Sequence, residues 1–125
     1  MTGGRAGRPR TGAGLGPDER LRKGWEYKQV YDAAETHHGR SLVVFVLLAP
    51  GLDRRAGFVA GRKTGDAVRR NRARRLLREA YRELKGRIPA MGVRLVFVAR
   101  PACPGQTRSD IFQEMESLLT RARVL

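Results

Sequence analysis

Basic residues are concentrated between Gly61 and Glu79, where the chain carries seven arginines and one lysine. At about 100° per residue along a helix, this segment and its continuation divide into two faces. The cationic face carries Asn71, Arg74, Arg75, Arg78, Arg82 and Lys85. The apolar face carries Leu76, Leu77, Ala80, Tyr81, Leu84 and Ile88. This pattern predicts a helix that packs on a core with one side and binds an anion with the other.

Acidic partners for these cations are scarce, since only Asp66, Glu79 and Glu83 lie nearby in the sequence. Pairs at i,i+4 spacing would therefore leave most of the arginines without a partner. Guanidinium groups stay charged and bind phosphate oxygens through two parallel hydrogen bonds. The sequence therefore favours an external polyphosphate over a solvated helix face.

The positive charge extends over the whole chain. Its 125 residues include 26 Lys+Arg and 12 Asp+Glu, which gives a formal net charge of +14 and a pI near 11.5. Nucleic acid is the commonest partner for such a composition, ahead of an anionic membrane surface and an acidic protein. Hydrophobic residues make up 41%, which excludes the disordered class, and the length suits one domain with one core.

Residues that could carry catalysis or bind a metal are few. His37 and His38 have no third ligand at a useful spacing, so we interpret them as part of a polar turn. The serines lack a nucleophile-elbow motif, and the single cysteine, Cys103, excludes an internal disulfide. No apolar run is long enough to span a bilayer, and no apolar segment near the N-terminus forms a signal peptide. We expect a cytoplasmic protein with no catalytic residue, metal site or membrane association of its own.

A small α/β domain must position these residues. Residues 1–17 are rich in Gly, Arg and Pro and are predicted to be a disordered basic tail, which leaves 18–125 as the folded domain. Periodicity and turn residues predict a helix over 18–35, strands over 42–48 and 57–61, the basic helix over 66–85, a strand over 93–99 and a helix over 107–123. Pro50-Gly51 is expected to end the first strand, which should be covered on both faces. These elements predict a two-layer sandwich of helices on a sheet. The strand-helix-strand unit over 57–99 would form a crossover, and such connections between parallel strands are generally right-handed.

The basic segment closely resembles the signature of a known family. It reads Lys63-x-Gly65-x-Ala67-Val68-x-Arg70-Asn71-Arg72-x-Arg74-Arg75-x-x-Arg78-Glu79. An Arg-Asn-Arg triplet on a helix is the central feature of the protein subunit of bacterial ribonuclease P. Leu21-Arg22-Lys23-x-x-Glu26-Tyr27-x-x-Val30-Tyr31 is similar to the family's first helix, and Val96-Phe97-Val98-Ala99-Arg100-Pro101 to its last strand. The resemblance covers residues 20–123. The chain departs from the family at Tyr27, where phenylalanine is usual, and at Val59 and Gly61, where polar residues are common.

The resemblance implies an α+β fold, a two-layer sandwich in the order α-β-β-β-α-β-α with a left-handed β-α-β crossover, as in domain 2 of ribosomal protein S5. It implies one short strand more than the sequence pattern shows. It also implies a non-catalytic protein subunit of a ribozyme that removes the 5′ leader from precursor tRNA. The partners would be ribonuclease P RNA and precursor tRNA, with no membrane and no required protein partner. Mg²⁺ would be held mainly by RNA.

The resemblance also assigns roles to particular residues. Contacts to the RNA subunit would come from Arg62, Arg70, Asn71, Arg72, Arg74, Arg75 and Arg78. A cleft for the single-stranded leader would be lined by Tyr27, Tyr31, Phe45 and Lys63. Helical geometry places Arg70 and Arg72 away from the Asn71 face, so part of the triplet is expected to stabilise the helix start or the cleft rim.

Two other functions compete with this interpretation. The first is a small ribosomal or general RNA-binding protein, which would have the same charge and architecture. In such a protein, ordinary core packing would explain the tyrosines. A metal-dependent nuclease acting alone would need a ligand cluster that the sequence lacks. The triplet motif favours the ribonuclease P family.

Overall fold

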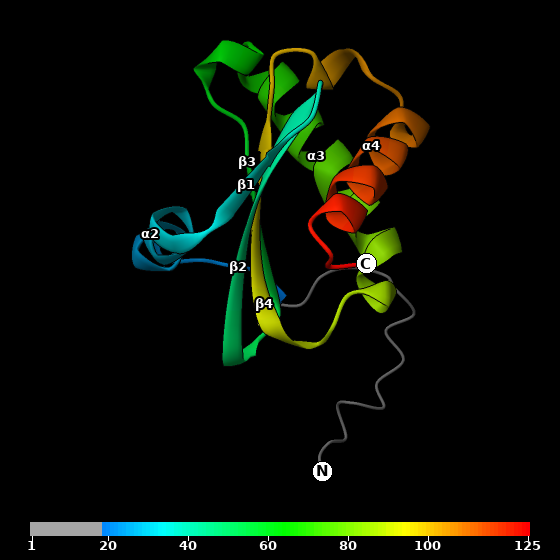
Figure 1. The fold of residues 1–125 in the computed structure, drawn as a ribbon. Helices are drawn as coiled ribbons and strands as arrows, with labels where there is room; N and C mark the ends of the chain where they lie inside the picture. Colours follow the sequence, from blue (N-terminus) through cyan, green and yellow to red (C-terminus); the bar gives the residue numbers. More distant parts are fainter. Residues whose placement is uncertain (1–18) are drawn as a thin grey trace, which may run out of the picture.

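The computed structural model of the protein describes residues 19–125. The predicted tail over residues 1–17 lies outside this range. The helices are α2 (Gly24–Ala33), α3 (Ala67–Leu84) and α4 (Arg108–Arg121), and the strands are β1 (Glu35–His38), β2 (Leu42–Asp53), β3 (Arg55–Val59) and β4 (Met91–Ala99) (Figure 1). Three short 3-10 helices, η2 (Arg62–Thr64), η3 (Lys85–Arg87) and η4 (Cys103–Gly105), connect them. The predicted order α-β-β-β-α-β-α is confirmed for the described residues.

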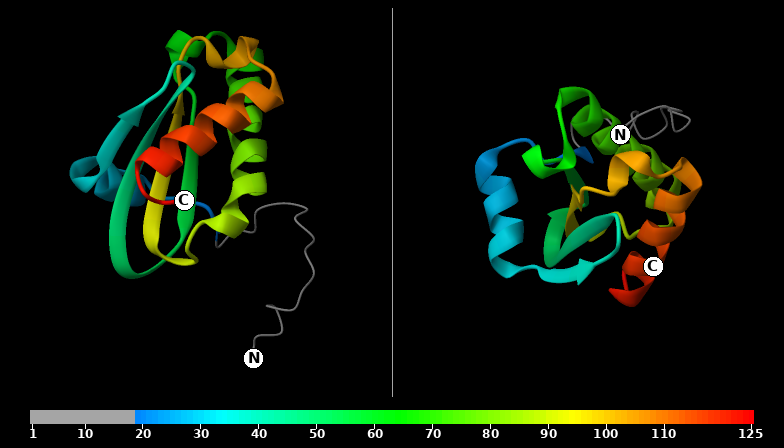
Figure 2. Two further views of the ribbon diagram at one scale, coloured as in Figure 1. Left: turned by 45° about the vertical axis from the view of Figure 1, so that its right-hand side comes forward. Right: turned by 90° about the horizontal axis from the view of Figure 1, so that it is seen from above.

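The strands form one sheet in the order β1-β2-β4-β3. β2 pairs antiparallel with β1 and β4, whereas β3 pairs parallel with β4. α3 and α4 cover one face of the sheet, and the short α2 lies on the other (Figures 1 and 2). Seen from the side of α3 and α4, with β3 and β4 pointing upward, β4 lies to the left of β3 (Figure 2). The crossover is therefore left-handed, because α3 lies on the face of the sheet from which β4 is to the left of β3. The right hand predicted from the general rule is wrong.

Two sequence predictions about the first strands are also wrong. His37 and His38 do not form a turn: they belong to β1, where they pair with Val44 and Val43 of β2. Pro50-Gly51 does not end β2 either, since the strand continues to Asp53. The register with β4 shifts between Leu48 and Asp53, so this irregular stretch accommodates the proline without a regular ladder.

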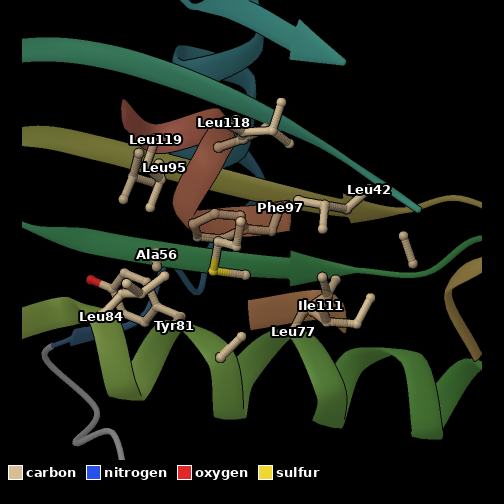
Figure 3. Close-up of a cluster of buried hydrophobic side chains, with 14 of the residues drawn as sticks. Leu42, Ala56, Leu77, Tyr81, Leu84, Leu95, Phe97, Ile111, Leu118 and Leu119 are labelled. Carbon is tan, nitrogen blue, oxygen red and sulfur yellow. The ribbon is translucent and has the colours of Figure 1, made fainter. Parts of the chain in front are cut away.

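The main core lies between the sheet and the pair α3 and α4 (Figure 3). The inward residues of β2 and β4 alternate along each strand, and they meet the apolar stripes of the two helices. This core contains Leu42, Val44 and Val46 from β2, Leu95 and Phe97 from β4, Leu76, Leu77, Tyr81 and Leu84 from α3, and Ile111, Met115, Leu118 and Leu119 from α4. The predicted apolar face of the basic helix is confirmed.

The opposite face of the sheet is only partly covered. Leu21, Val30 and Val96 form a small buried cluster beneath α2. The outward residues of β2, Val43, Phe45 and Leu47, are half-buried. β2 is therefore fully covered on one face only, contrary to the sequence prediction, because α2 is too short to extend over the whole sheet.

The start of α3 is fixed by local hydrogen bonding. Asp66 is the N-cap residue, and its carboxylate accepts a hydrogen bond from the backbone N–H of Arg69 at 3.0 Å. Gly65, immediately before it, has φ +132°, a conformation that favours glycine. The predicted N-cap is confirmed, and it sets the rotation of the arginine face about the helix axis.

Candidate nucleic-acid interface

Three arginines of α3 have no carboxylate partner among the described residues. Arg74, Arg75 and Arg78 project from the side opposite the core, and within residues 19–125 none of them forms a salt bridge. The two acidic residues of the helix are engaged elsewhere, since Arg108 of α4 pairs with Glu79 at 3.2 Å and with Glu83 at 3.1 Å. The acids nearest in sequence therefore leave the charge of this face uncompensated.

These cations are close enough to affect one another. Partial burial lowers the pKa of Arg78, and the positive charges of Arg20, Arg74 and Arg75 lower it further, against a smaller opposing effect of the Glu79 carboxylate. The pKa shift is in the direction expected for a like-charge cluster. Arg74 also donates a hydrogen bond to the side-chain oxygen of Asn71, which orients both groups on one surface. A bound phosphate would relieve the repulsion and accept several of these donors.

Arg70 and Arg72 of the triplet make contacts within the protein. Arg70 donates to the carbonyl of Gly65 at 3.2 Å, at the helix start. Arg72 donates to the carbonyls of Pro104 at 2.7 Å and Gln106 at 3.3 Å, so it holds the η4 segment against α3. The expectation that part of the triplet stabilises the helix start is met by Arg70. Arg62, in η2, is exposed, and its side chain has no hydrogen-bond or ion-pair partner among the described residues.

A pocket of about 670 Å³ lies beside this surface, at the edge of β3. Its lining combines four arginines with two aromatic rings, and it consists of Arg20, Leu21, Arg22, Tyr27, Ala56, Gly57, Phe58, Arg74 and Arg78. We call it the arginine pocket. Its lining contains no carboxylate, so the pocket is strongly cationic.

Arg20 and Arg22 are functional candidates that the sequence prediction missed. The chain reaches β3 through an isolated parallel bridge between Arg20 and Ala56, in which the N–H of Leu21 donates to the carbonyl of Ala56 at 3.0 Å. This bridge brings Arg20 next to Arg78 of α3. The one signal available in the sequence is the Arg20-x-Arg22-Lys23 run just before the first helix.

The predicted leader cleft is assembled only in part. Tyr31 and Phe45 meet edge to face, with ring centroids 4.9 Å apart and planes at 82°. Tyr31 is 42% exposed, and burial raises the pKa of its phenol, so it remains a neutral hydrogen-bond donor at physiological pH. Lys63 lies on a different element, η2, beyond the end of β3. Of the residues predicted to line the cleft, Tyr31 and Phe45 therefore contact each other directly.

Tyr27 links this aromatic pair to the arginine pocket. It shares the α2 side of the sheet with Phe45, and its ring also lines the pocket with Arg74 and Arg78. The ring lies directly over Gly57, where a Cβ atom would come within 2.5 Å of the Tyr27 ring. The absence of a side chain at residue 57 therefore allows the Tyr27 ring to pack closely against the edge strand, between the aromatic pair and the arginines.

A buried ionic network fixes α2 to the sheet. Glu26 at the start of α2 accepts hydrogen bonds from the backbone N–H groups of Arg22 at 2.8 Å and Lys23 at 3.0 Å. Its other oxygen lies 3.2 Å from Arg55 of β3 and 3.8 Å from Arg94 of β4. Both Glu26 and Arg94 are buried. The network sets the position of the helix that carries Tyr27 and Tyr31.

The described residues include no metal-ligand cluster, reactive thiol or membrane-spanning helix. No group of three or more His, Cys, Asp or Glu side chains within residues 19–125 could hold a metal ion. Burial raises the pKa of the Cys103 thiol to about 11, so it is a packed side chain and not a reactive thiolate. Over the same range, every helix is too short or too polar to cross a membrane.

Comparison with known proteins matches both the sequence and the fold. A family model described as ribonuclease P matches residues 15–123. The ribonuclease P protein component of Symbiobacterium thermophilum is 40% identical over 107 residues, which cover 85% of this chain and 92% of that protein. The corresponding protein of Nitratiruptor sp. is 39% identical over 98 residues, 78% of this chain and 86% of that protein.

Solved structures agree with these relatives. The RNase P protein of Thermotoga maritima superposes with a TM-score of 0.71 at 30% identity, over 82% of this chain and 96% of that one. The RNase P protein of Staphylococcus aureus gives a TM-score of 0.75 at 26% identity, over 85% of this chain and 96% of that one.

Proposed function

From the premise that this chain belongs to the ribonuclease P protein family, as a protein component of the enzyme that matures the 5′ end of tRNA, we propose how its surface divides that task. The arginine face of α3 binds the RNA subunit. The aromatic pair Tyr31 and Phe45 binds the single-stranded 5′ leader of precursor tRNA.

The observation that supports RNA binding most strongly is the uncompensated charge of α3. Arg74, Arg75 and Arg78 have no carboxylate partner within the described chain, while Arg108 neutralises the two acids of the same helix. An isolated protein gains nothing from such an arrangement, because like charges repel. RNA phosphates supply the missing counter-charge, and the release of condensed cations makes the binding favourable.

Binding of the leader is supported by the shape of the α2 side of the sheet. Tyr31 and Phe45 present an edge-to-face pair on a half-covered apolar surface. Aromatic rings stack on any unpaired base, so this platform tolerates leaders of different sequence. The adjoining arginine pocket adds positive charge for the leader's phosphates. In this arrangement Tyr31 and Phe45 hold the bases, and Arg20 of the pocket adds positive charge for the backbone, while Arg74 and Arg78 remain contacts for the RNA subunit.

The division of labour leaves the chemistry to RNA. The described part of the chain offers no ligand cluster for Mg²⁺, so we assign the metal mainly to the phosphates of the RNA subunit and the substrate. Mg²⁺ prefers oxygen ligands and keeps much of its water, which suits such sites. We place this complex in the cytoplasm and assign it no further protein subunit.

One experiment tests the proposed function. Cleavage of a precursor tRNA is measured with the protein alone, with a bacterial ribonuclease P RNA alone at low Mg²⁺, and with both together. We expect cleavage at the leader junction only in the combined reaction. Cleavage by the protein alone would overturn the proposal in favour of a protein nuclease. Equal cleavage with and without protein at saturating concentrations would indicate a general RNA-binding protein.

A further inference from the structure

The chain's single tryptophan lies on the surface. This is unusual, because burying the large indole ring normally stabilises a fold strongly. Trp25 is in the first turn of α2 and is 63% exposed. At about 100° per residue, it lies on the flank of α2 opposite Tyr27 and Tyr31, with the buried stripe of Glu26 and Val30 between the two flanks. The proposed leader contacts therefore do not involve it.

Trp25 borders a second pocket of about 560 Å³, within the size range of small-molecule sites. The pocket is lined by Arg22, Lys23, Trp25, Glu26, Gln29, Leu52, Arg55 and Arg94. We call it the tryptophan pocket. Trp25 and Leu52 supply apolar surface, and the cations are grouped around it.

The pocket is cationic despite the presence of Glu26. That carboxylate is buried and is compensated by Arg55, Arg94 and two backbone N–H groups. Arg22 and Lys23 are exposed at the rim, and neither side chain has an ion-pair partner within residues 19–125. A ligand that enters the pocket therefore meets an indole ring and two available positive charges.

Arg22 connects the two pockets, because it lines the arginine pocket as well as the tryptophan pocket. A polyanion held by Arg74 and Arg78 can continue past Arg22 and reach Trp25 without leaving positively charged surface. A protein partner would need an acidic patch that follows the same course. The continuity of charge over both pockets favours a nucleic-acid strand.

We propose that the tryptophan pocket binds one unpaired nucleotide of RNA, with the base stacked on the Trp25 indole and the adjacent phosphate held by Arg22 and Lys23. The inference rests on the proposed function, which supplies the RNA. Stacking on an exposed ring beside cations is the usual way in which single-stranded RNA is held without base specificity. The nucleotide belongs either to the RNA subunit or to the precursor tRNA, and the two sources can be separated.

The position of the lone tryptophan provides a direct spectroscopic test. The unmodified protein is titrated first with a bacterial ribonuclease P RNA, and the assembled complex is then titrated with precursor tRNA and with mature tRNA. Tryptophan emission and its quenching by acrylamide are followed, while a gel-shift assay reports binding independently. We expect emission to fall and the indole to become protected in one of the two titrations. The first would identify the RNA subunit as the source, and the second the substrate.

Matched variants test the contribution to affinity. Trp25→Ala is expected to weaken the titration that quenches the indole by about 5- to 150-fold. Trp25→Phe keeps an aromatic face and should retain much of the affinity. Leu48→Ala removes another exposed apolar side chain, 72% exposed, that lines neither pocket, and it should leave binding unchanged. Circular dichroism confirms that each variant is folded.

The outcomes separate this inference from the proposed function. If the gel shift saturates but emission, acrylamide access and the affinity of Trp25→Ala stay unchanged, RNA binds elsewhere and the tryptophan pocket is not a nucleotide site. If the gel shift shows no binding to the RNA subunit, the proposed function itself fails. Should Trp25→Ala lose its fold, the fluorescence of the unmodified protein still decides the question.

Discussion

Arg94, within β4, donates two hydrogen bonds to Asp53 at the end of β2, from Nη2 to the carboxylate at 2.6 Å and from Nε to the backbone carbonyl at 2.9 Å. Its remaining nitrogen faces Glu26 of α2 at 3.8 Å. One buried guanidinium thus holds the irregular end of β2 and the first turn of α2 to the same strand. The position of α2, the helix proposed to bind the leader, depends on this side chain.

Replacing Arg94 by methionine should destabilise the fold by about 3–5 kcal/mol, because the change leaves Glu26 buried with one cation fewer. Urea unfolding followed by circular dichroism measures the loss. Arg87→Met is the matched control, since Arg87 is 52% exposed in its pair with Glu116, and such surface pairs contribute about 0–1 kcal/mol. Equal losses in the two variants would contradict the structural role given to Arg94.

The same network predicts the effect of acid. Burial raises the pKa of Glu26, but the N–H groups of Lys23 and Arg22 and the charges of Arg55 and Arg94 outweigh it, so its pKa is lowered. Burial also acts on Asp53, and its hydrogen bonds to Arg55 and Arg94 likewise lower its pKa. A carboxylate whose folded pKa is depressed stabilises the fold above its unfolded pKa, about 4, and loses that contribution as pH falls through the folded value.

The free energy of unfolding should therefore be steady from pH 7 to about pH 5 and then fall below about pH 4. Urea midpoints measured at intervals over this range give the profile. Glu26→Gln should be less stable at neutral pH and show a shallower decline in acid. An identical slope in the variant would mean that other carboxylates control the acid response.

The arginines of α3 should separate into two classes. The double change Arg74→Ala and Arg78→Ala should weaken binding to the RNA subunit and reduce its salt dependence by about 0.7–0.9 of a logarithmic unit for each phosphate that is no longer neutralised, with the thermal midpoint unchanged. Arg72→Ala should instead lower stability by about 1–3 kcal/mol, because the carbonyls of Pro104 and Gln106 lose a charged donor. Salt-dependent titrations and thermal melts distinguish these classes, and a reversed result would exchange the roles of the two groups of arginines.

Tyr31→Ala in the assembled enzyme should cost about 1–3 kcal/mol in binding precursor tRNA, with little change for mature tRNA, which has no leader to stack. Both affinities are measured on one preparation, beside a melt of the free protein. A purely structural tyrosine would weaken both tRNAs alike and lower the melting temperature. That result would remove Tyr31 from the cleft and leave the arginine surface unaffected.

The hydroxyl of Tyr81 is the one buried side-chain polar atom in residues 19–125 without a hydrogen-bond partner. Burial raises its pKa to about 12, so it remains protonated under all ordinary conditions. Tyr81→Phe keeps the ring contacts with Phe58 and Phe97 and removes an unsatisfied group, so stability should rise by about 1 kcal/mol. A loss of stability in urea unfolding would show that the hydroxyl is satisfied in solution.

The elements that the sequence predicts best carry their own signals. α3 has an apolar stripe and the cap Asp66, and α4 has its own stripe and the cap Thr107. β1 could not be predicted from the residues, because Glu35–His38 has no apolar alternation and exists as a strand only through its pairing with β2. Its existence followed from the family resemblance alone, which also indicated the hand of the crossover.

The candidate site could also be predicted only as far as local sequence patterns allow. Helical periodicity places Arg74, Arg75 and Arg78 on one face, but it carries no information on which segment lies opposite them. Arg20 joins the site through a bridge to β3, and Arg72 is drawn away by carbonyls of η4. Both facts depend on contacts between segments distant in sequence, which no local pattern contains.

The uncovered strip of the sheet beside α2 has a thermodynamic consequence. A longer helix would have sealed Phe45 and Val98 into a second complete core, whereas here they stay half-buried. In the proposed complex a stacked nucleotide would take the place of that missing helix, and RNA would then act as part of the protein's second layer. Since a ligand that binds only the native state stabilises it by mass action, the melting temperature of the protein should rise with the concentration of RNA. Folding and ribonucleoprotein assembly are then one coupled equilibrium.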